Sequence, residues 1–272
     1  MKISVLMENL EKLGIHPTKL RGQNFLIDDN ILNKIVRESN IKKTDRVLEV
    51  GPGFGSLTAK LIDKSKKVLA VEFDRKLHQF LEDEYSESSN LKLLHKDVLK
   101  VEEKEITKNL GKNYKIVANL PYSITSNFIR KFLEAKNKPS EMVLMIQKEV
   151  GERMLAKSPD MNILALSVQL FSKPKILFTV SESCFFPAPK VKSVVIRLEL
   201  LKSDLSRKEQ DLFFKLIKTG FSSKRKKLIG NLGKSFDKKL LHSFFEELGL
   251  DENVRAQELE LDDWKKLVKL FG

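Results

Sequence analysis

The sequence predicts an α/β protein, in which a parallel sheet of about seven strands is covered by helices on both faces and followed by a small all-helical domain. Short runs of apolar and β-branched residues alternate with stretches of helical period through roughly the first 200 residues. After that point apolar residues recur only at helical spacing. The length of 272 residues, 41% of them hydrophobic, is sufficient for one large and one small domain.

Seven apolar runs are expected to form the strands. RVLEV (46–50) is followed by an apolar-periodic stretch to about residue 64, and KVLAVEF (67–73) is followed by RKLHQFLEDEY. The remaining runs lie at residues 91–95, 114–120, 141–147, 175–180 and 194–200. Strands that alternate with helices in this way are typical of a parallel sheet with both faces covered.

The pattern changes near LLKSDLSRKE (200–209). The later segments LFFKLIKTGF, KKLLHSFFEELG and DDWKKLVKLFG have helical period, with Gly at or near their ends. We therefore expect two domains, an α/β domain over residues 1–204 and a helical domain over residues 205–272.

The composition restricts the class of protein. The 50 Lys and Arg exceed the 37 Asp and Glu, giving a net charge of +13, which favours a nucleic-acid partner over an anionic membrane. One cysteine excludes a disulfide framework and a multi-Cys zinc site, and the four histidines lack ligand spacing, so we expect no metal. No apolar run approaches the ~18 residues of a membrane span, and the N-terminus does not resemble a signal peptide. We expect a cytoplasmic protein.

A glycine-rich loop, GPGFG (51–55), directly follows the first expected strand and precedes a helical stretch. Glycines allow positive φ and close approach of the backbone to a ligand. The spacing is G-x-G-x-G rather than the G-x-G-x-x-G of pyrophosphate sites, and Pro52 removes one N–H donor. The loop thus favours a nucleoside-like ligand without phosphate, the alternative being an ordinary tight turn.

Acids follow the next two expected strands. Glu72 lies at the end of the second strand, where it is suited to accept hydrogen bonds from ribose hydroxyls, and Asp97 follows the third, where it is suited to an adenine amino group. The alternatives are an exposed strand-end acid and a helix N-cap, respectively. Since ligands of open α/β sheets bind at the carboxyl ends of the strands, the set predicts S-adenosylmethionine (AdoMet).

The tetrapeptide Asn119-Leu120-Pro121-Tyr122 ends the fourth expected strand. An adenine N6 amine is a poor nucleophile because its lone pair is delocalised into the ring. The Asn119 side-chain oxygen and the Leu120 carbonyl would accept its two hydrogens and aim the lone pair at a methyl donor, while Tyr122 offers a stacking face. Such catalysis needs neither a metal nor a covalent nucleophile. The alternative is a plain strand-to-helix turn.

A second aromatic segment, CFFPAPKV (184–191), lies between the last two expected strands. One of its Phe rings would close on the base from the other side, or else serve as a buried anchor of the loop.

Together these segments resemble the KsgA-type ribosomal RNA adenine N6-dimethyltransferases. The matching motifs are GQNFL (22–26), GPGFGSLT (51–58), NLPY (119–122), QKEV (147–150) followed by Arg153, FFPAPKVKS (185–193), Phe221 with KRK (224–226) and NL (231–232), and RAQEL (255–259). Arg21 and the segment 160–165 depart from the usual family pattern. Large-subunit rRNA methyltransferases of antibiotic resistance more often carry GSGKG and NIPY, so the GPGFGSLT and NLPY of this sequence favour the small-subunit branch.

The resemblance implies a Rossmann-like AdoMet-dependent methyltransferase domain with a C-terminal domain that binds RNA or the ribosome. It implies cofactor contacts from Asn24, Leu26, Gly51, Gly53, Glu72, Asp97 and Asn119. It also implies that Tyr122 and Phe185, rather than Phe186, sandwich the target adenine beside Asn119 and Leu120.

The implied reaction transfers four methyl groups to two adjacent adenosines in a hairpin loop near the 3′ end of 16S rRNA, by a monomer acting on the immature small ribosomal subunit. The run Lys224, Arg225, Lys226 and Lys227 would bind rRNA phosphates, or else form a solvated helix face. Two other functions stay open: an assembly factor whose catalysis is incidental, and a methyltransferase for adenine of 23S rRNA or DNA.

Overall fold

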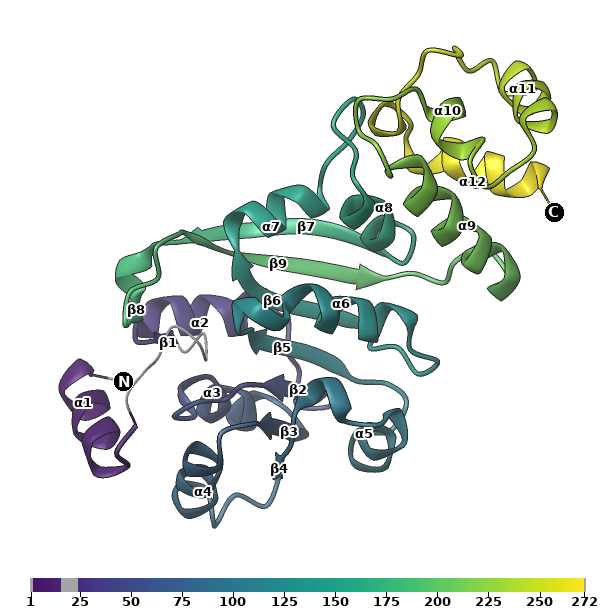
Figure 1. Cartoon of the computed structure of the whole chain (residues 1–272). Coiled ribbons are helices and arrows are strands. Elements are labelled where there is room, and N and C mark those ends of the chain that lie inside the picture. Colours follow the sequence, from purple (N-terminus) through teal and green to yellow (C-terminus); the bar gives the residue numbers. More distant parts are fainter. Residues whose placement is uncertain (1, 16–23, 272) are drawn as a thin grey trace. The chain divides into compact units, whose positions relative to one another are not determined.

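The computed structural model describes residues 2–15 and 24–271 (Figure 1). The chain divides into two compact units. The first comprises Met1–Gly151 and Pro174–Leu200, and the second comprises Glu152–Lys173 and Leu201–Gly272.

The described residues of the first unit form a seven-stranded sheet with the order β4-β3-β2-β5-β6-β9-β7. Its strands are β2 (Arg46–Val50), β3 (Lys67–Glu72), β4 (Leu91–His95), β5 (Lys115–Asn119), β6 (Glu141–Gln147), β7 (Ser172–Val180) and β9 (Ser193–Leu200). The seven predicted strands are thereby confirmed. The expectation of a wholly parallel sheet is wrong in one place, because β9 runs antiparallel to β6.

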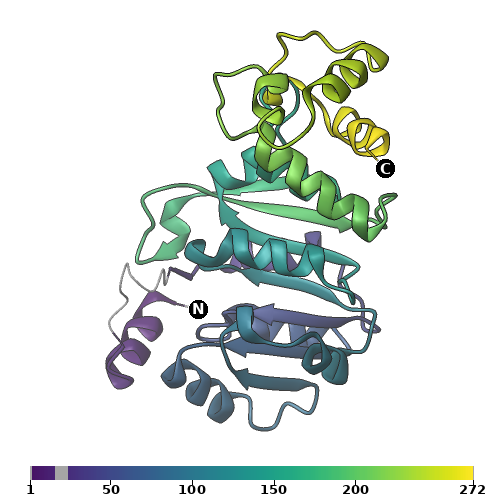
Figure 2. The ribbon, with the colours of Figure 1, turned by 45° about the vertical axis from the view of Figure 1, so that its right-hand side comes forward.

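Helices cover both faces of this sheet (Figures 1 and 2). They are α2 (Asp29–Glu38), α3 (Ser56–Lys64), α4 (Arg75–Glu84), α5 (Glu103–Leu110), α6 (Thr125–Glu134) and α7 (Lys148–Met154). Asp28 and Asp74 begin α2 and α4 by accepting backbone N–H bonds in the first turn. The result is a Rossmann-like α/β fold.

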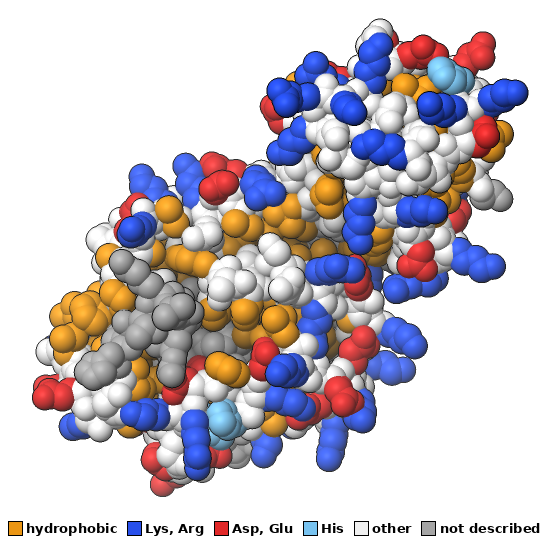
Figure 3. All heavy atoms as spheres, viewed as in Figure 1, with side chains coloured by type: hydrophobic (Ala, Val, Ile, Leu, Met, Phe, Trp, Pro, Cys, Tyr) orange, Lys and Arg blue, Asp and Glu red, His pale blue; other side chains and the backbone are white. Residues whose placement is uncertain are grey.

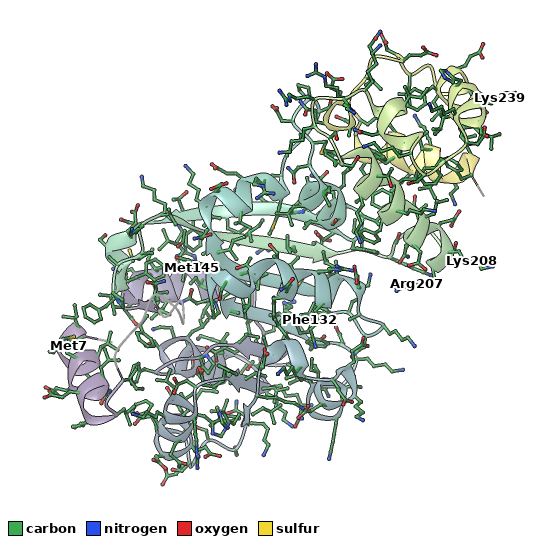
Figure 4. The ribbon with its side chains drawn as sticks, viewed as in Figure 1. Met7, Phe132, Met145, Arg207, Lys208 and Lys239 are labelled. Carbon is green, nitrogen blue, oxygen red and sulfur yellow. The ribbon has the colours of Figure 1, made fainter. Side chains whose placement is uncertain are left out.

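The core lies between the sheet and these helices. The central strands β2, β3, β5 and β6 are buried along nearly their whole length, and Val47, Leu69 and Ile116 are 0% exposed, as expected of strands covered on both faces. The edge strands β4 and β7 are mostly half-buried or exposed. Phe132 of α6 and Met145 of β6 are labelled in Figure 4, and both are buried.

A second, two-stranded sheet joins segments far apart in the sequence and was not predicted. Strand β1 (Phe25–Leu26) pairs antiparallel with β8 (Phe185–Phe186), so that Leu26 lies opposite Phe185 and Phe25 opposite Phe186. Alternate residues of a strand point to opposite faces. Leu26 and Phe185 accordingly join the main core, while Phe25 and Phe186 pack beside Phe54 and the buried face of α1 (Ile3–Lys12).

The second unit is helical. It contains α8 (Ile163–Gln169), α9 (Arg207–Gly220), α10 (Leu228–Leu232), α11 (Lys238–Glu247) and α12 (Leu261–Leu270). Phe213 of α9 and Trp264 of α12 are fully buried in its core. Residues 152–173 also belong to this unit, so it consists of two separate stretches of the chain, whereas a single boundary at residue 204 was expected. The assignment of residues 1–204 to catalysis and 205–272 to RNA binding stays a prediction.

Among residues 2–15 and 24–271, no helix has the length and apolarity to cross a membrane.

Candidate active site

A cavity of about 360 Å³ lies at the carboxyl ends of the parallel strands. Its walls come from the loops after β2, β3, β4 and β5 and from the N-terminal segment that carries β1. The sequence-predicted site residues that line it are Asn24, Leu26, Gly51, Gly53, Glu72, Asp97, Asn119, Leu120 and Tyr122. The fold thus gathers nine residues that are separated by up to 98 positions in the sequence.

The glycine loop has the backbone conformation that requires glycine. Gly51, Gly53 and Gly55 have φ values of 64°, 60° and 78°. A Cβ on Gly55 would also lie 2.6 Å from a ring carbon of Tyr85, and one on Gly53 would lie 3.2 Å from the ring of Phe25. The loop therefore requires glycine at these positions, and Gly51 and Gly53 line the cavity.

Glu72 is held by the backbone around it. Its Oε2 accepts from the Gly53 N–H at 3.1 Å, and its Oε1 accepts from the N–H groups of Phe73 and Asp74 at 2.8 and 2.9 Å. Burial raises the pKa of this carboxyl, and the three hydrogen bonds oppose that rise. A carboxylate offers about four acceptor positions, so Glu72 retains capacity for a ligand hydroxyl.

Asp97 has two features that the sequence left as alternatives. Its Oδ1 accepts from the Leu99 N–H at 2.9 Å and so caps the short 3-10 helix Val98–Lys100. The same residue lines the cavity. The helix N-cap therefore orients a carboxylate that can also meet a ligand.

The Asn119–Tyr122 segment is fixed on three sides. The Asn119 Nδ2 donates to the Asn24 carbonyl at 3.4 Å, which orients the amide and turns its oxygen away from Asn24. The Leu120 N–H donates to the Met145 carbonyl at 3.2 Å. The Tyr122 hydroxyl hydrogen-bonds the Ser193 Oγ at 2.7 Å, and burial raises its pKa. Asn119, Leu120 and Tyr122 thus lie together at one wall of the cavity.

Phe185 lies elsewhere. It is 3% exposed, packs with Leu26 and Val180 in the core, and is absent from the cavity lining formed by the described residues. The physical reason is the alternation of β8, which pairs Phe185 with Leu26 on the core side. The structure places Phe185 as a buried anchor of its loop, and its stacking on a base stays a prediction.

Glu49 and Phe73 also line the cavity, and the sequence motifs did not predict a role for either. Glu49 is 1% exposed, and its Oε2 has no hydrogen-bond partner within the described part of the chain. Burial raises its pKa to about 8, and the nearby Glu72 contributes in the same direction. Phe73, directly after Glu72, is 74% exposed. Two features of the sequence could have indicated them: Glu49 is an acid within an apolar strand, and Phe73 is an aromatic residue directly after a strand end.

The basic run lies in the second unit, in the turn between α9 and α10 rather than on a helix face. All four side chains from Lys224 to Lys227 are exposed, and none forms an ion pair with another described residue. Lys and Arg side chains are otherwise spread over the visible face of each unit (Figure 3).

The described residues contain no group of three or more His, Cys, Asp or Glu that could hold a metal ion. Gly22 and Gln23 of the N-terminal motif lie outside the described residues.

The sequence matches the family model described as "Ribosomal RNA adenine dimethylase" over residues 18–272. Two curated relatives, from Dehalococcoides mccartyi and Fusobacterium nucleatum, are named "Ribosomal RNA small subunit methyltransferase A". Both are 40% identical to the chain; the first alignment covers 96% of the chain and 90% of the relative, and the second covers 93% and 97%.

Solved structures agree with this result. A dimethyladenosine transferase from Plasmodium falciparum is 31% identical, with a TM-score of 0.77 over 89% of this chain and 95% of the other. The 23S rRNA methyltransferase ErmE has a TM-score of 0.74 over 91% of this chain and 99% of the other, at 21% identity, and shows the fold alone.

Proposed function

Because the chain belongs to the ribosomal RNA adenine dimethylase family and is a methyltransferase, we propose that it uses AdoMet to dimethylate N6 of two adjacent adenosines in the 3′-terminal hairpin loop of 16S rRNA. The observation that carries the proposal is the cavity wall on which Asn119, Leu120 and Tyr122 meet, beside the acids Glu72 and Asp97. We further propose that the protein acts as a cytoplasmic monomer on the immature small subunit.

The cavity residues fit AdoMet. When bound, AdoMet supplies an electrophilic methyl group on a sulfonium, and it also carries an ammonium group and two ribose hydroxyls. Glu72 would accept from the ribose hydroxyls and Asp97 from the adenine amino group. The buried Glu49 has an Oε2 without a partner among the described residues, and a cationic ligand would supply one.

The residues Asn119, Leu120 and Tyr122 would act by orienting the target adenine. The Asn119 amide donates to Asn24, so that its oxygen is left to accept one N6 hydrogen of the target, and the Leu120 carbonyl would accept the other. This geometry directs the N6 lone pair toward the methyl group. The face of Tyr122 would stack on the base. The acceleration then comes from positioning and from electrostatics inside the cavity.

The helical unit would supply affinity for RNA. The exposed run Lys224–Lys227 has no ion-pair partner among the described residues and would neutralise rRNA phosphates. Such binding weakens as salt rises, because each phosphate contact releases counterions.

The test is a modification map of ribosomal RNA from cells that lack the protein. We expect N6,N6-dimethyladenosine to disappear from two adjacent positions near the 3′ end of 16S rRNA and to return on complementation. Loss of the mark from 23S rRNA instead would overturn the proposal. Normal subunit maturation by an Asn119→Ala protein would favour the assembly factor with incidental catalysis.

A further inference from the structure

We propose that Ser193 is a positioning residue for catalysis, which fixes the ring of Tyr122 as a platform for the target base. The Ser193 Oγ and the Tyr122 hydroxyl are 2.7 Å apart. Ser193 is 0% exposed, so water does not reach the Ser193 side of this bond, while Tyr122 is half-buried. The inference rests on the proposed function, in which Tyr122 stacks on the adenine.

The position of Ser193 results from the antiparallel direction of β9, which the sequence did not predict. Because β9 runs antiparallel to β6, it begins at the sheet edge where β5 and β6 end. Its first residue, Ser193, lies opposite Gln147, the last residue of β6. A parallel strand would have placed its first residue at the other edge, away from the cavity.

The backbone on both sides of Ser193 is held in place. The preceding residue, Lys192, accepts a hydrogen bond from the Lys148 N–H at 2.9 Å, and the following residue, Val194, pairs with Ile146 in the ladder. A Cβ on Gly151 would lie 2.5 Å from Val194, which shows how closely α7 packs there. Ser193 is thus a rigid anchor.

Tyr122 needs such an anchor. It begins the 3-10 helix Tyr122–Ile124 directly after Pro121, and it is one of the residues that line the cavity. A tyrosine ring has two rotatable side-chain bonds, and a hydrogen bond at the far end of the ring restricts both. Without it the hydroxyl would be left buried and unsatisfied, or the ring would turn away from the stacking orientation to reach water. An error of about 1 Å in such positioning can cost roughly 100-fold in rate.

The experiment compares the full-length protein with Ser193→Ala, Tyr122→Phe and the double variant, on small subunits from cells that lack the protein. We expect each single variant to lower kcat about 10-fold while the AdoMet Kd changes less than about twofold. The double variant should be no slower than either single variant, because both remove the same bond. Ser193→Thr, which keeps the hydroxyl, should restore most of the rate.

Ser39→Ala is the matched control. Ser39 is also 0% exposed, but its hydroxyl donates to the Ile35 carbonyl within α2, so we expect an unchanged kcat. Independent, multiplying losses in the double variant, or wild-type kcat in Ser193→Ala, would overturn the inference. Should Ser193→Ala fail to fold, Tyr122→Phe removes the same bond with Ser193 intact, and its full activity would overturn it equally. Absence of transfer by the wild-type protein would instead refute the proposed function.

Discussion

Glu49→Gln is expected to change how the stability of the protein depends on pH. The carboxyl is 1% exposed and its pKa is raised to about 8, from an ordinary value of 4.5. Between these two pH values the folded protein holds a proton on Glu49 that the unfolded chain has lost. The free energy of unfolding therefore falls as pH rises through this window, and is restored as pH returns below 4.5.

The size of the effect follows from the shift. At ~1.36 kcal/mol per pKa unit, the rise from 4.5 to about 8 corresponds to about 5 kcal/mol of lost stability across the window. That is a large part of the 5–15 kcal/mol typical of a folded protein. A glutamine cannot ionise, so Glu49→Gln should lose none of its stability from this source.

The assay is urea unfolding of both proteins at intervals from pH 5 to pH 9. We expect the wild-type protein to weaken relative to Glu49→Gln as pH rises, while contributions from groups that do not interact with Glu49 cancel in the difference. Parallel stability curves would refute the reasoning. Calorimetry in buffers of different ionisation enthalpy extends the test: AdoMet binding at pH 7 should release a proton from the wild-type protein and none from Glu49→Gln, because a cationic ligand favours the ionised carboxylate.

Two other predictions follow from the glycine loop and the basic turn. Gly55→Ala should destabilise the protein by about 2 kcal/mol or more in urea unfolding, because φ is +78° and the new Cβ would lie 2.6 Å from Tyr85. The control is Gly230→Ala in α10, where the added Cβ meets no described atom within 4 Å. This variant should be neutral or stabilising. Neutralising Lys224–Lys227 with Gln should lower the slope of log K against log salt for rRNA binding by about 3 to 4, without changing AdoMet affinity; an unchanged slope would exclude these side chains from the RNA contact.

Local pattern sufficed for much of the fold and site. The seven strands are runs of apolar, often β-branched residues, and parallel strands bring the residues after each carboxyl end to one edge, which is why Glu72, Asp97 and Asn119 meet as expected. The direction of β9 is not encoded in its own residues, and β1 and β8 are only two residues long, too short for a period.

Other features depend on tertiary packing. The sequence contains two adjacent phenylalanines, and only the pairing of β8 with β1 turns Phe185 into the core. The unsatisfied oxygen of Glu49 arises because its strand is covered on both faces, which a single acid in an apolar run does not reveal. Similarly, the Ser193–Tyr122 contact joins residues 71 positions apart.

The central claim is that Asn119 orients a 16S rRNA adenine for methyl transfer. It is tested most directly by incubating small subunits from cells lacking the protein with AdoMet and either the wild-type protein or Asn119→Ala, and then mapping dimethyladenosine by mass spectrometry. We predict two adjacent dimethyladenosines in the 3′ hairpin loop with the wild-type protein, and a rate at least about 100-fold lower with Asn119→Ala. Undiminished transfer by Asn119→Ala, or modification at other sites, would contradict the account.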